Sequence, residues 1–478
     1  MKKTSLALQL ALMLFIFSFM LIIPYYLLFT TFWRQGLIII SIFWFLNLAF
    51  IYDAWINRRS DKQSKISWTI LLSWPLPLFL IYLWSSKRFF WHRKKYIDIN
   101  NLEQEIFQNN PLRKYTDNLD LKILSDGQMM FNSILDDLDL AKETIWIEFF
   151  ILNEGISFNI LKQKLIDKAN QGVKIKILTD YAGNIQNNNK IYKDLNNTEN
   201  IEFVIFNKIF LLFSNGNSNL RSHNKIIVID SKCGYFGGFN IGDDYLSLYS
   251  KYGFWYDIHF KTMNLEFIND LKAQFILDWY KATNIKELNE IKKLDLKGTE
   301  TNKITYQAFS DGYNFEEPKF LNKFISLIQN SSKSLKFVSP YLILPQSILK
   351  ELINASQRGV KIEIITTGRA DKKSAYYSSR YYLNLLSKNN IKIYRTNNFF
   401  LHAKYYIFDD KITMVGTSNL DSRSIYLHYE YNFVIWDQKI ADKLILNSWN
   451  ELLSLSTLTN YEKNLIPSCL IKFISPIL

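Results

Sequence analysis

Residues 223–230 read His-Asn-Lys-Ile-Ile-Val-Ile-Asp, and residues 402–409 read His-Ala-Lys-Tyr-Tyr-Ile-Phe-Asp. After each histidine, a glycine follows at 14 residues and an asparagine at 17 residues, and these asparagines are Asn240 and Asn419. The chain has five histidines, and agreement at all of these offsets around two of them marks a duplicated unit. The two stretches therefore predict a fold made of two related halves.

The spacing within each stretch places its histidine and lysine on one face of a strand. Residues two apart in a strand point to the same side, so His223 can share a ligand with Lys225, and His402 with Lys404. Four apolar residues follow each lysine, which predicts a buried strand that begins at the histidine–lysine pair. Each pair is thus expected at the start of a rigid element.

The other polar residues of the duplicated motif are two aspartates and two asparagines. Asp230 and Asp409 belong with the histidines and lysines in the catalytic motif. They point to the opposite face of the strand from the histidines and lysines, because they lie an odd number of residues away. We therefore expect them to accept hydrogen bonds from nearby turn amides. Asn240 and Asn419 follow a tight turn, and their amide nitrogens can donate to an anionic oxygen. We expect both asparagines to bind or orient the substrate.

From about residue 119 onward, short apolar runs alternate with helical stretches. This alternation predicts an α/β fold with a largely buried sheet. A strand is expected at residues 145–152, with its counterpart at residues 335–344. A connection rich in lysine and glutamate separates the two halves, which we place at residues 119–285 and 300–478.

A membrane region is expected at residues 1–95. Three apolar runs lie near residues 5–32, 36–52 and 67–85, and a helix needs about 20 apolar residues to cross the hydrocarbon core. The first run is too long for the apolar part of a signal peptide, so we expect an uncleaved anchor. The third run contains two prolines, which would kink a helix or make the segment re-entrant. We therefore predict two to three hydrophobic segments in a multi-pass protein of the cell membrane.

The chain carries a net charge of +13, and the position of that charge favours a membrane over nucleic acid. Twelve basic and three acidic residues lie among the first hundred, so +9 of the +13 flanks the apolar runs. Flanking charge of this kind orients membrane segments and attracts anionic lipid headgroups, whereas a nuclease would concentrate it in the soluble part. We expect a membrane partner and no nucleic acid, and the oligomeric state stays open.

Two basic clusters around the third apolar run leave open which side of the membrane holds the soluble region. Arg58–Lys65 precedes the run, and Lys87–Lys95 follows it. If the run crosses the membrane, the soluble region lies opposite Arg58. If its prolines turn it back, the soluble region shares the cytoplasmic side with Lys2 and Lys3, and this is the arrangement that we expect.

No metal ion or other cofactor is expected. Cys233 and Cys469 lie far apart and offer neither the paired spacing of a zinc site nor a disulfide framework. The histidine–lysine motifs are not accompanied by a carboxylate cluster, and a protonated lysine is a poor metal ligand.

The residue types of the motif point instead to phosphodiester transfer. A neutral imidazole can attack phosphorus while a second, protonated imidazole acts as the acid, and two lysines and two amides can hold the phosphoryl oxygens. Each histidine also needs an orienting partner, and one carboxylate follows each motif, Asp257 and Glu430. His259 and His428 lie two residues from these acids, and we expect them to be packing residues.

At these residues the sequence resembles the phospholipase D superfamily, whose signature HxKxxxxD, followed by a glycine-rich turn and an asparagine, is present twice. The resemblance covers residues 119–478. Within the superfamily, the hydrophobic amino terminus and three stretches resemble the bacterial cardiolipin synthases, namely residues 237–245, 339–341 and 419–424.

The resemblance implies two tandem α/β halves packed as one catalytic unit, with the two motifs meeting at their interface. It also implies a membrane phosphatidyltransferase that attacks phosphatidylglycerol, releases glycerol, and passes the phosphatidyl group from a histidine to a second phosphatidylglycerol, which gives cardiolipin. By the same analogy His223 is the nucleophile and His402 the acid and then the base. The repeat makes the reverse assignment nearly as good from the residues alone.

Two other functions fit parts of the sequence. A phosphodiesterase of the same superfamily would hydrolyse phospholipid or nucleic acid, because the motifs do not report whether water is excluded from the site. A non-catalytic membrane protein would keep only a phosphate-binding cleft, which the intact double motif disfavours.

Overall fold

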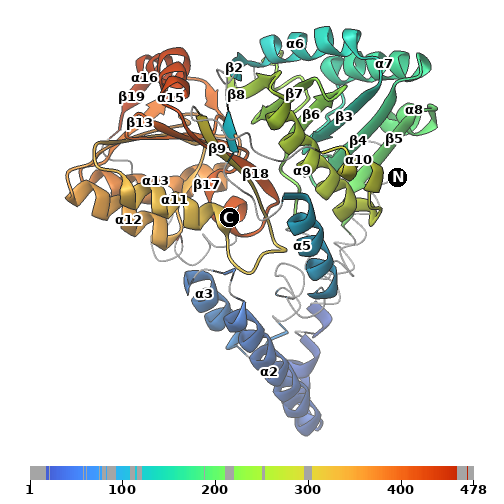
Figure 1. Ribbon diagram of the computed structural model, residues 1–478. Helices are drawn as coiled ribbons and strands as arrows, with labels where there is room; N and C mark the ends of the chain where they lie inside the picture. Colours follow the sequence, from blue (N-terminus) through green and yellow to red (C-terminus); the bar gives the residue numbers. More distant parts are fainter. Residues whose placement is uncertain are drawn as a thin grey trace.

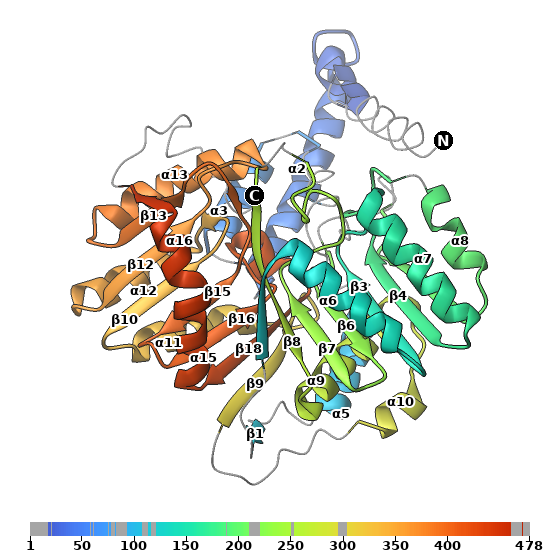
Figure 2. The ribbon, with the colours of Figure 1, turned by 90° about the horizontal axis from the view of Figure 1, so that it is seen from above.

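The computed structural model describes most of the chain, in ranges separated by short gaps. These are residues 18–20, 22–57, 59–60, 62–74, 76–77, 82, 93–107, 113–115, 121–187, 189–209, 220–249, 253–294, 304–459 and 471. Two sheet-bearing halves lie side by side, and a pair of helices projects from them (Figure 1). The view from above shows the two sheets side by side, with helices along both (Figure 2).

The first half is built on an eight-stranded sheet in the order β14-β8-β7-β6-β3-β4-β5, with β2 paired to β8. Its strands are β2 (Leu121–Asp126), β3 (Thr144–Phe149), β4 (Lys174–Asp180), β5 (Ile201–Phe206), β6 (Lys225–Ile229), β7 (Cys233–Gly237), β8 (Trp255–Thr262) and β14 (Phe400–Leu401). Its helices are α6 (Gly127–Leu140), α7 (Ile156–Asn170), η2 (Asn189–Tyr192), α8 (Lys193–Asn197), α9 (Leu265–Thr283) and α10 (Leu288–Lys292).

The second half is built on a nine-stranded sheet in the order β1-β9-β18-β16-β15-β10-β12-β13-β19. Its strands are β1 (Arg113–Tyr115), β9 (Ile304–Asp311), β10 (Ser334–Val338), β12 (Lys361–Thr366), β13 (Lys392–Thr396), β15 (Tyr405–Phe408), β16 (Ile412–Gly416), β18 (Glu430–Trp436) and β19 (Ser456–Leu458), and a small separate pair is β11 (Leu342–Ile343) with β17 (Leu420–Asp421). Its helices are α11 (Lys319–Asn330), α12 (Gln346–Gln357), α13 (Lys373–Ser387), α14 (Ser422–Tyr426), α15 (Gln438–Leu444), η5 (Ile445–Trp449) and α16 (Asn450–Ser454).

The same strand arrangement occurs in both halves. In the first, β3 is parallel to β4 on one side and antiparallel to β6 on the other. In the second, β10 is parallel to β12 and antiparallel to β15. The predicted strands at residues 145–152 and 335–344 are confirmed as β3 and as β10 with the short β11. The four apolar residues after each lysine are buried, as their continuous hydrophobicity predicts.

One hydrophobic core joins the halves. The ring of Phe433 from β18 lies 4.6 Å from Phe236 of β7 and 4.5 Å from Phe267 of α9, measured between centroids. Most of α9 is buried, and the helix begins with a side-chain cap in which Asn264 accepts a hydrogen bond from the Phe267 amide. The halves also share strands, because β14 from the second half joins β8 of the first sheet.

A helix that precedes both halves ties them further. Leu102 of α5 (Arg93–Phe107) lies in the core that α9 occupies. The same helix reaches the second half through a hydrogen bond of 2.7 Å from Asn314 Nδ2 to Asn100 Oδ1 and an ion pair of 2.7 Å between Lys319 and Glu103. The catalytic unit therefore begins before residue 119.

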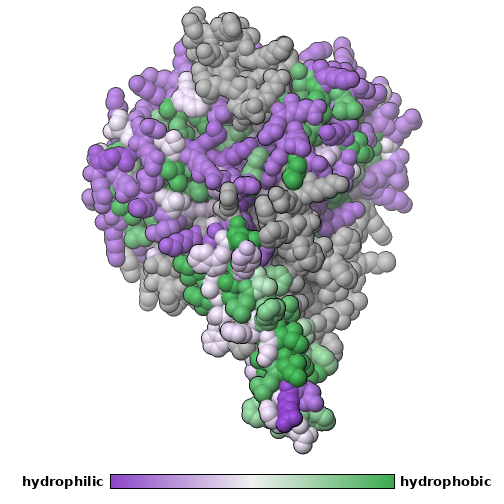
Figure 3. Space-filling view, turned by 60° about the horizontal axis from the view of Figure 1, so that its bottom comes forward, coloured by the Kyte–Doolittle hydropathy of each residue, from purple (hydrophilic) through white to green (hydrophobic). Residues whose placement is uncertain are grey.

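One described helix is long and apolar enough to cross a membrane, namely α2 (Trp33–Ile56). Most of its side chains are exposed, and Figure 3 shows hydrophobic side chains gathered over the projecting helices, whereas hydrophilic side chains predominate among the coloured residues of the two halves on the face shown. Residues 5–17 of the first predicted segment lie outside the described residues, and residues 22–28 are helical. The prediction of two to three spans is therefore supported for one helix.

The third apolar run returns along α2. After the loop at residues 57–60, α3 (Lys62–Leu72) packs against α2, with a hydrogen bond of 2.8 Å from Trp55 Nε1 to Thr69 Oγ1. The carbonyl oxygens of Trp74 and Leu76 then accept hydrogen bonds of 2.8 Å from Asn47 Nδ2. By Tyr82 the chain is back near the end of α2, because its hydroxyl lies 2.8 Å from an oxygen of Asp53.

Candidate active site

The two histidine–lysine pairs meet at the border of the halves. Each pair stands at the start of its strand, β6 or β15, and the backbone of each histidine is held by the other half. The amide of His223 donates to the Tyr429 carbonyl at 2.9 Å, and the amide of His402 donates to the Tyr256 carbonyl at 2.7 Å. Tyr429 directly precedes Glu430, and Tyr256 directly precedes Asp257. These contacts therefore place each histidine beside an acid of the other half.

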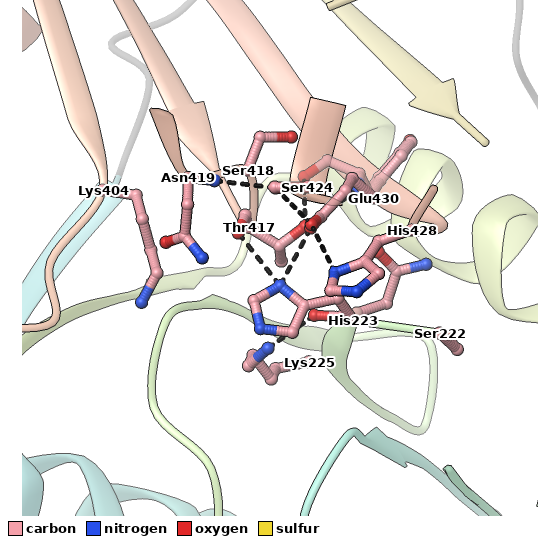
Figure 4. Close-up of polar contacts among 12 residues, drawn as sticks. Ser222, His223, Lys225, Lys404, Thr417, Ser418, Asn419, Ser424, His428 and Glu430 are labelled. Carbon is pink, nitrogen blue, oxygen red and sulfur yellow. Dashed lines mark hydrogen bonds and ion pairs between the residues drawn. The ribbon is translucent and has the colours of Figure 1, made fainter. Parts of the chain in front are cut away.

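Each histidine is oriented by the acid of the opposite half. Nδ1 of His223 lies 3.0 Å from Oε2 of Glu430, as Figure 4 shows. Nδ1 of His402 lies 2.6 Å from Oδ2 of Asp257. A carboxylate at Nδ1 favours the tautomer whose proton is on Nδ1 and leaves Nε2 free to react. The predicted acids are therefore brought to the histidines, but in a crossed arrangement.

The lysines lie directly behind the histidines. Nζ of Lys225 donates to the His223 carbonyl at 2.5 Å. Nζ of Lys404 lies 2.6 Å from Nδ1 of His402 and 3.6 Å from Asp257. Both ammonium groups are buried, so an anionic phosphoryl oxygen in the site would meet charge that water does not screen.

Burial sets the protonation of this cluster. It lowers the pKa of His223 to about 3, although Glu430 acts in the opposite direction. It also lowers the pKa of His402 well below its usual value, with Lys404 adding to the effect. Burial raises the pKa of Glu430, but its contacts with His223 outweigh burial and hold that pKa well below the usual value. Burial thus favours the neutral form of both imidazoles, while the contacts with His223 favour the ionised form of Glu430.

The lysine side chains are shifted toward neutrality by the same cause. Burial, and then the charge of Lys404, lower the pKa of Lys225 to about 7. Burial lowers the pKa of Lys404 to about 8, against the pull of Asp257. A bound dianion or monoanion would favour the charged form of both.

A cavity of about 390 Å³ lies at this site. His223, His402, Asn240 and Asn419 all line it. Aromatic and basic side chains complete its wall, namely Phe150, Tyr245, Trp255, Tyr341, Arg221, Lys372 and Arg423. A pocket with apolar walls and converging nitrogen donors fits a phosphodiester that carries apolar groups.

The two asparagines differ in how far their side chains are already engaged. Oδ1 of Asn240 accepts a hydrogen bond of 3.1 Å from the Ile151 amide. Oδ1 of Asn419 is buried and has no hydrogen-bond partner among the described residues, while its backbone amide donates to Ser424 Oγ at 2.9 Å. Asn419 is therefore the residue of the pair whose side chain is free to rearrange around a ligand.

Asp230 and Asp409 lie at the opposite end of their strands from the histidines. Oxygens of Asp230 accept hydrogen bonds of 2.8 Å from the amides of residues 142, 143 and 144. Asp409 accepts from the amides of residues 332, 333 and 334 at 2.8 to 3.2 Å. The two aspartates hold the turn before β3 and β10, so they are scaffold residues and do not belong to the catalytic set.

The roles of two other residues of the site were not predicted from the sequence. His428, expected to be a packing residue, instead lines the cavity with its ring 5.6 Å from that of His223 and Nδ1 3.7 Å from Glu430. Ser424 Oγ donates to the other oxygen of Glu430 at 2.5 Å. His259 is buried in the first half and does not line the cavity. The contact of His428 with His223 joins residues of different halves, which no repeat or periodicity relates.

A possible cation site coincides with this cluster. Among the described residues, ligand atoms of His223, His428 and Glu430 lie within 4.8 Å of one another. Both oxygens of Glu430 already accept hydrogen bonds, from His223 and Ser424. The arrangement is accounted for by these hydrogen bonds without a metal ion.

Comparisons with known proteins agree with the site. Residues 134–279 and 324–448 match the family described as cardiolipin synthase, PLD-like domain. The chain is 29% identical over 482 residues to the major cardiolipin synthase ClsA of Bacillus subtilis (strain 168), which covers 92% of this chain and 99% of that protein. It is 32% identical over 380 residues to a cardiolipin synthase of Clostridium perfringens (strain SM101 / Type A), over 77% of this chain and 79% of the relative.

One solved structure shares the fold. The crystal structure of phosphatidylserine synthase from Haemophilus influenzae Rd KW20 superposes with a TM-score of 0.60 at 16% identity. The match covers 80% of this chain and 100% of that one. At this identity the likeness is one of fold.

Proposed function

The chain belongs to the cardiolipin synthase family of phospholipase D-like proteins, and from this premise we propose how its site makes cardiolipin. The reaction is phosphatidyl transfer, in which two molecules of phosphatidylglycerol give cardiolipin and glycerol. One observation carries the proposal: a histidine from each half lines one cavity, and each of these histidines is oriented by a buried acid and contacted by the lysine of its own motif.

In the first step, Nε2 of His223 attacks the phosphorus of phosphatidylglycerol. The bond between phosphorus and the glycerol headgroup oxygen breaks, and His402 gives that oxygen its proton, so that glycerol leaves and the phosphatidyl group stays on His223. Burial favours the neutral form of His402, so His402 has to take up a proton from solvent as the anionic substrate binds, because the charge of the substrate raises the pKa of a nearby imidazole.

In the second step, a hydroxyl of another phosphatidylglycerol enters the place that glycerol has left. His402, now neutral, takes the hydroxyl proton, the oxygen attacks phosphorus, and the bond between phosphorus and His223 breaks. Lys225, Lys404, Asn240 and Asn419 hold the phosphoryl oxygens while negative charge builds on them. His223 returns to its neutral state, which Glu430 orients for the next cycle.

The anchor geometry supports a cytoplasmic catalytic unit. The loop after α2 is embedded in that unit, so the unit lies on the side of the membrane where α2 ends. The third apolar run contacts Asn47, which lies nine residues before Ile56, the last residue of α2. Along a helix this is a depth of about 14 Å, in a hydrocarbon core of about 30 Å. At Tyr82 the run is again beside Asp53, close to the end of α2. We infer that this run is re-entrant and that both basic clusters share one side, which the positive-inside rule assigns to the cytoplasm.

Protease protection tests this topology. In sealed spheroplasts, protease added outside should leave the catalytic halves, proposed as residues 119–285 and 300–478, intact. Lysis should then expose them to digestion. Cleavage of the halves in sealed spheroplasts would place the unit on the outer side and contradict the re-entrant arrangement.

The lysine pKa values predict an alkaline loss of activity. As pH rises through about 7 and then about 8, Lys225 and Lys404 lose their protons in the free enzyme, and with them the charge that binds phosphate. The value of kcat/KM, which reports the free enzyme, should fall above pH 7, whereas kcat should hold to higher pH because bound phosphate stabilises the ammonium forms. Rate profiles at low and saturating substrate check this, and a flat kcat/KM up to pH 9 would contradict it.

Product analysis tests the function itself. Membranes that contain the protein are incubated with phosphatidylglycerol labelled in its headgroup glycerol and acyl chains. Cardiolipin and free glycerol in equal amounts are the expected products. Phosphatidic acid without cardiolipin would mean that water, and not a second lipid, resolves the intermediate, which is the activity of a hydrolase.

A further inference from the structure

Arg59 lies in the short loop between α2 and α3, yet its side chain is buried in the second half. Its exposed fraction is 2%, as low as that of its ion-pair partner Asp311, whose oxygen lies 2.8 Å from Nη2. The sequence places this arginine in a basic cluster next to the membrane, where contact with lipid headgroups is the ordinary role. Burial in the catalytic unit excludes that role for Arg59.

The guanidinium closes the end of a helix that belongs to the active site. Nε donates to the Tyr426 carbonyl at 2.9 Å, and Nη2 donates to the Ile425 carbonyl at 3.1 Å. These are the last residues of α14, and the final carbonyl groups of a helix have no partner within it. A cation at this position also complements the negative end of the helix. Arg59 therefore fixes the carboxyl end of α14.

The ion-pair partner of Arg59 is paired in register with Glu430, the acid that orients His223. Asp311 at the end of β9 faces Glu430 across the antiparallel ladder between β9 and β18. Its second oxygen accepts a hydrogen bond of 2.7 Å from the amide of Phe320, at the start of α11. Arg59 also donates a hydrogen bond of 3.2 Å from Nη1 to the Glu317 carbonyl, in the loop before α11. Its side chain thus contacts β9, α14 and this loop.

A continuous chain of contacts leads from this helix to Nδ1 of His223, the nitrogen opposite the reacting Nε2. Asp421 caps the start of α14 by accepting from the Ser424 amide at 2.8 Å. Ser424 Oγ donates to Oε1 of Glu430 at 2.5 Å, and Oε2 of Glu430 orients His223 at 3.0 Å. The same Ser424 hydroxyl accepts from the Asn419 amide, so one helix turn sets both a histidine partner and a cavity asparagine.

We propose that Arg59 is a positioning residue that couples the membrane anchor to His223, through α14, Ser424 and Glu430. The phosphatidyl transfer would then depend on the loop after α2 being docked in the catalytic unit. The inference rests on the proposed function, because its readout is the phosphatidyl-transfer rate.

The test compares two variants that each remove one positive charge from the same juxtamembrane segment. Arg59→Met removes the buried guanidinium, and Lys62→Met removes an exposed ammonium at the start of α3. In full-length protein in phosphatidylglycerol vesicles, Arg59→Met should lower kcat about 10- to 100-fold with KM within about twofold, since a small misplacement of a reacting group costs this much while the cavity stays intact. Lys62→Met should behave as the unaltered protein.

A double-variant cycle shows whether the effect travels through Ser424. If Arg59 acts by holding Ser424 against Glu430, then Arg59→Met in a Ser424→Ala background should lower kcat by less than about twofold further. If the two substitutions acted independently, their losses of kcat would multiply instead. If Arg59→Met does not accumulate in the membrane, Arg59→Lys, which keeps the charge but loses the fork of donors, replaces it in the same cycle, with an intermediate loss of kcat expected.

The outcomes separate this inference from the proposed function. Absence of cardiolipin from the unaltered protein would contradict the function whatever the variants do. If the unaltered protein is active, equal kcat values for Arg59→Met and Lys62→Met would overturn the inference alone. Multiplicative losses in the cycle with Ser424→Ala would also overturn it, since Arg59 would then act independently of Ser424.

Discussion

Replacing His223 with alanine should lower cardiolipin formation by at least the 10²- to 10⁴-fold that a single acid–base residue contributes, and His402→Ala should do the same. The first variant lacks the atom that forms the bond to phosphorus. The second lacks the proton donor for glycerol and the base for the incoming hydroxyl. A loss of about 10³-fold corresponds to about 4 kcal/mol of transition-state stabilisation.

An activated donor separates the two roles, which the repeat leaves symmetric. In a phosphatidyl ester of p-nitrophenol, the leaving group needs no proton. His402→Ala should therefore still release a burst of one nitrophenol per site and trap the phosphatidyl group on the protein, whereas His223→Ala should show neither. The burst is followed by absorbance, and the trapped lipid by radiolabel after acid-free precipitation.

A burst from His223→Ala and none from His402→Ala would make His402 the nucleophile and His223 the acid, without changing the chemistry. Near-normal rates in either variant would exclude a histidine mechanism at this cavity. His259→Asn is a matched control, because this buried histidine lies two residues from Asp257 but does not line the cavity, and it should keep most of the activity.

Replacing Glu430 with glutamine should lower turnover by about 10²- to 10⁴-fold, the second largest loss that we expect. Glutamine fills the same space but cannot carry the negative charge that holds the Nδ1 proton of His223 and stabilises its cationic state. The intact fold is checked by the thermal unfolding midpoint, and the loss by steady-state turnover in vesicles.

The crossed arrangement of acids gives this prediction a second part. Because Glu430 contacts His223 and Asp257 contacts His402, Glu430→Gln should slow formation of the trapped phosphatidyl group from the activated donor. Asp257→Asn should leave that burst nearly intact and slow its resolution by the acceptor lipid. If each acid served the histidine of its own half, the two variants would show the reverse pattern.

Much of the fold follows from local patterns. The apolar tetrads after Lys225 and Lys404 predict buried strands, and the structure confirms them as β6 and β15. The repeat also predicts that the neighbouring strands are the same in both halves. Exchanged elements such as β14 could not be predicted, because a two-residue strand has no periodicity and is defined only by its partner in the other sheet.

The sequence predicted which residues make up the site, but not how they contact one another. Spacing identified both histidines, both lysines, both asparagines and the two acids, since residue type and strand parity are local properties. The cavity role of His428 was missed, because it depends on where β18 meets the other half. The third apolar run could be read as crossing or re-entrant, and only the contacts of Asn47 and Tyr82 favour the return path.

The sequence by itself determined that this protein has two phosphodiester-binding motifs on two α/β halves behind a hydrophobic anchor. Tertiary structure alone decided that Glu430 contacts His223 and that Asp257 contacts His402. It also decided that Arg59 is buried beside α14, although its neighbours in the sequence form a basic cluster next to the membrane. The physical reason is that parity and hydrophobicity act between residues a few positions apart. An ion pair between Arg59 and Asp311, 252 positions apart, forms only when the packed halves and the anchor bring both groups out of water together.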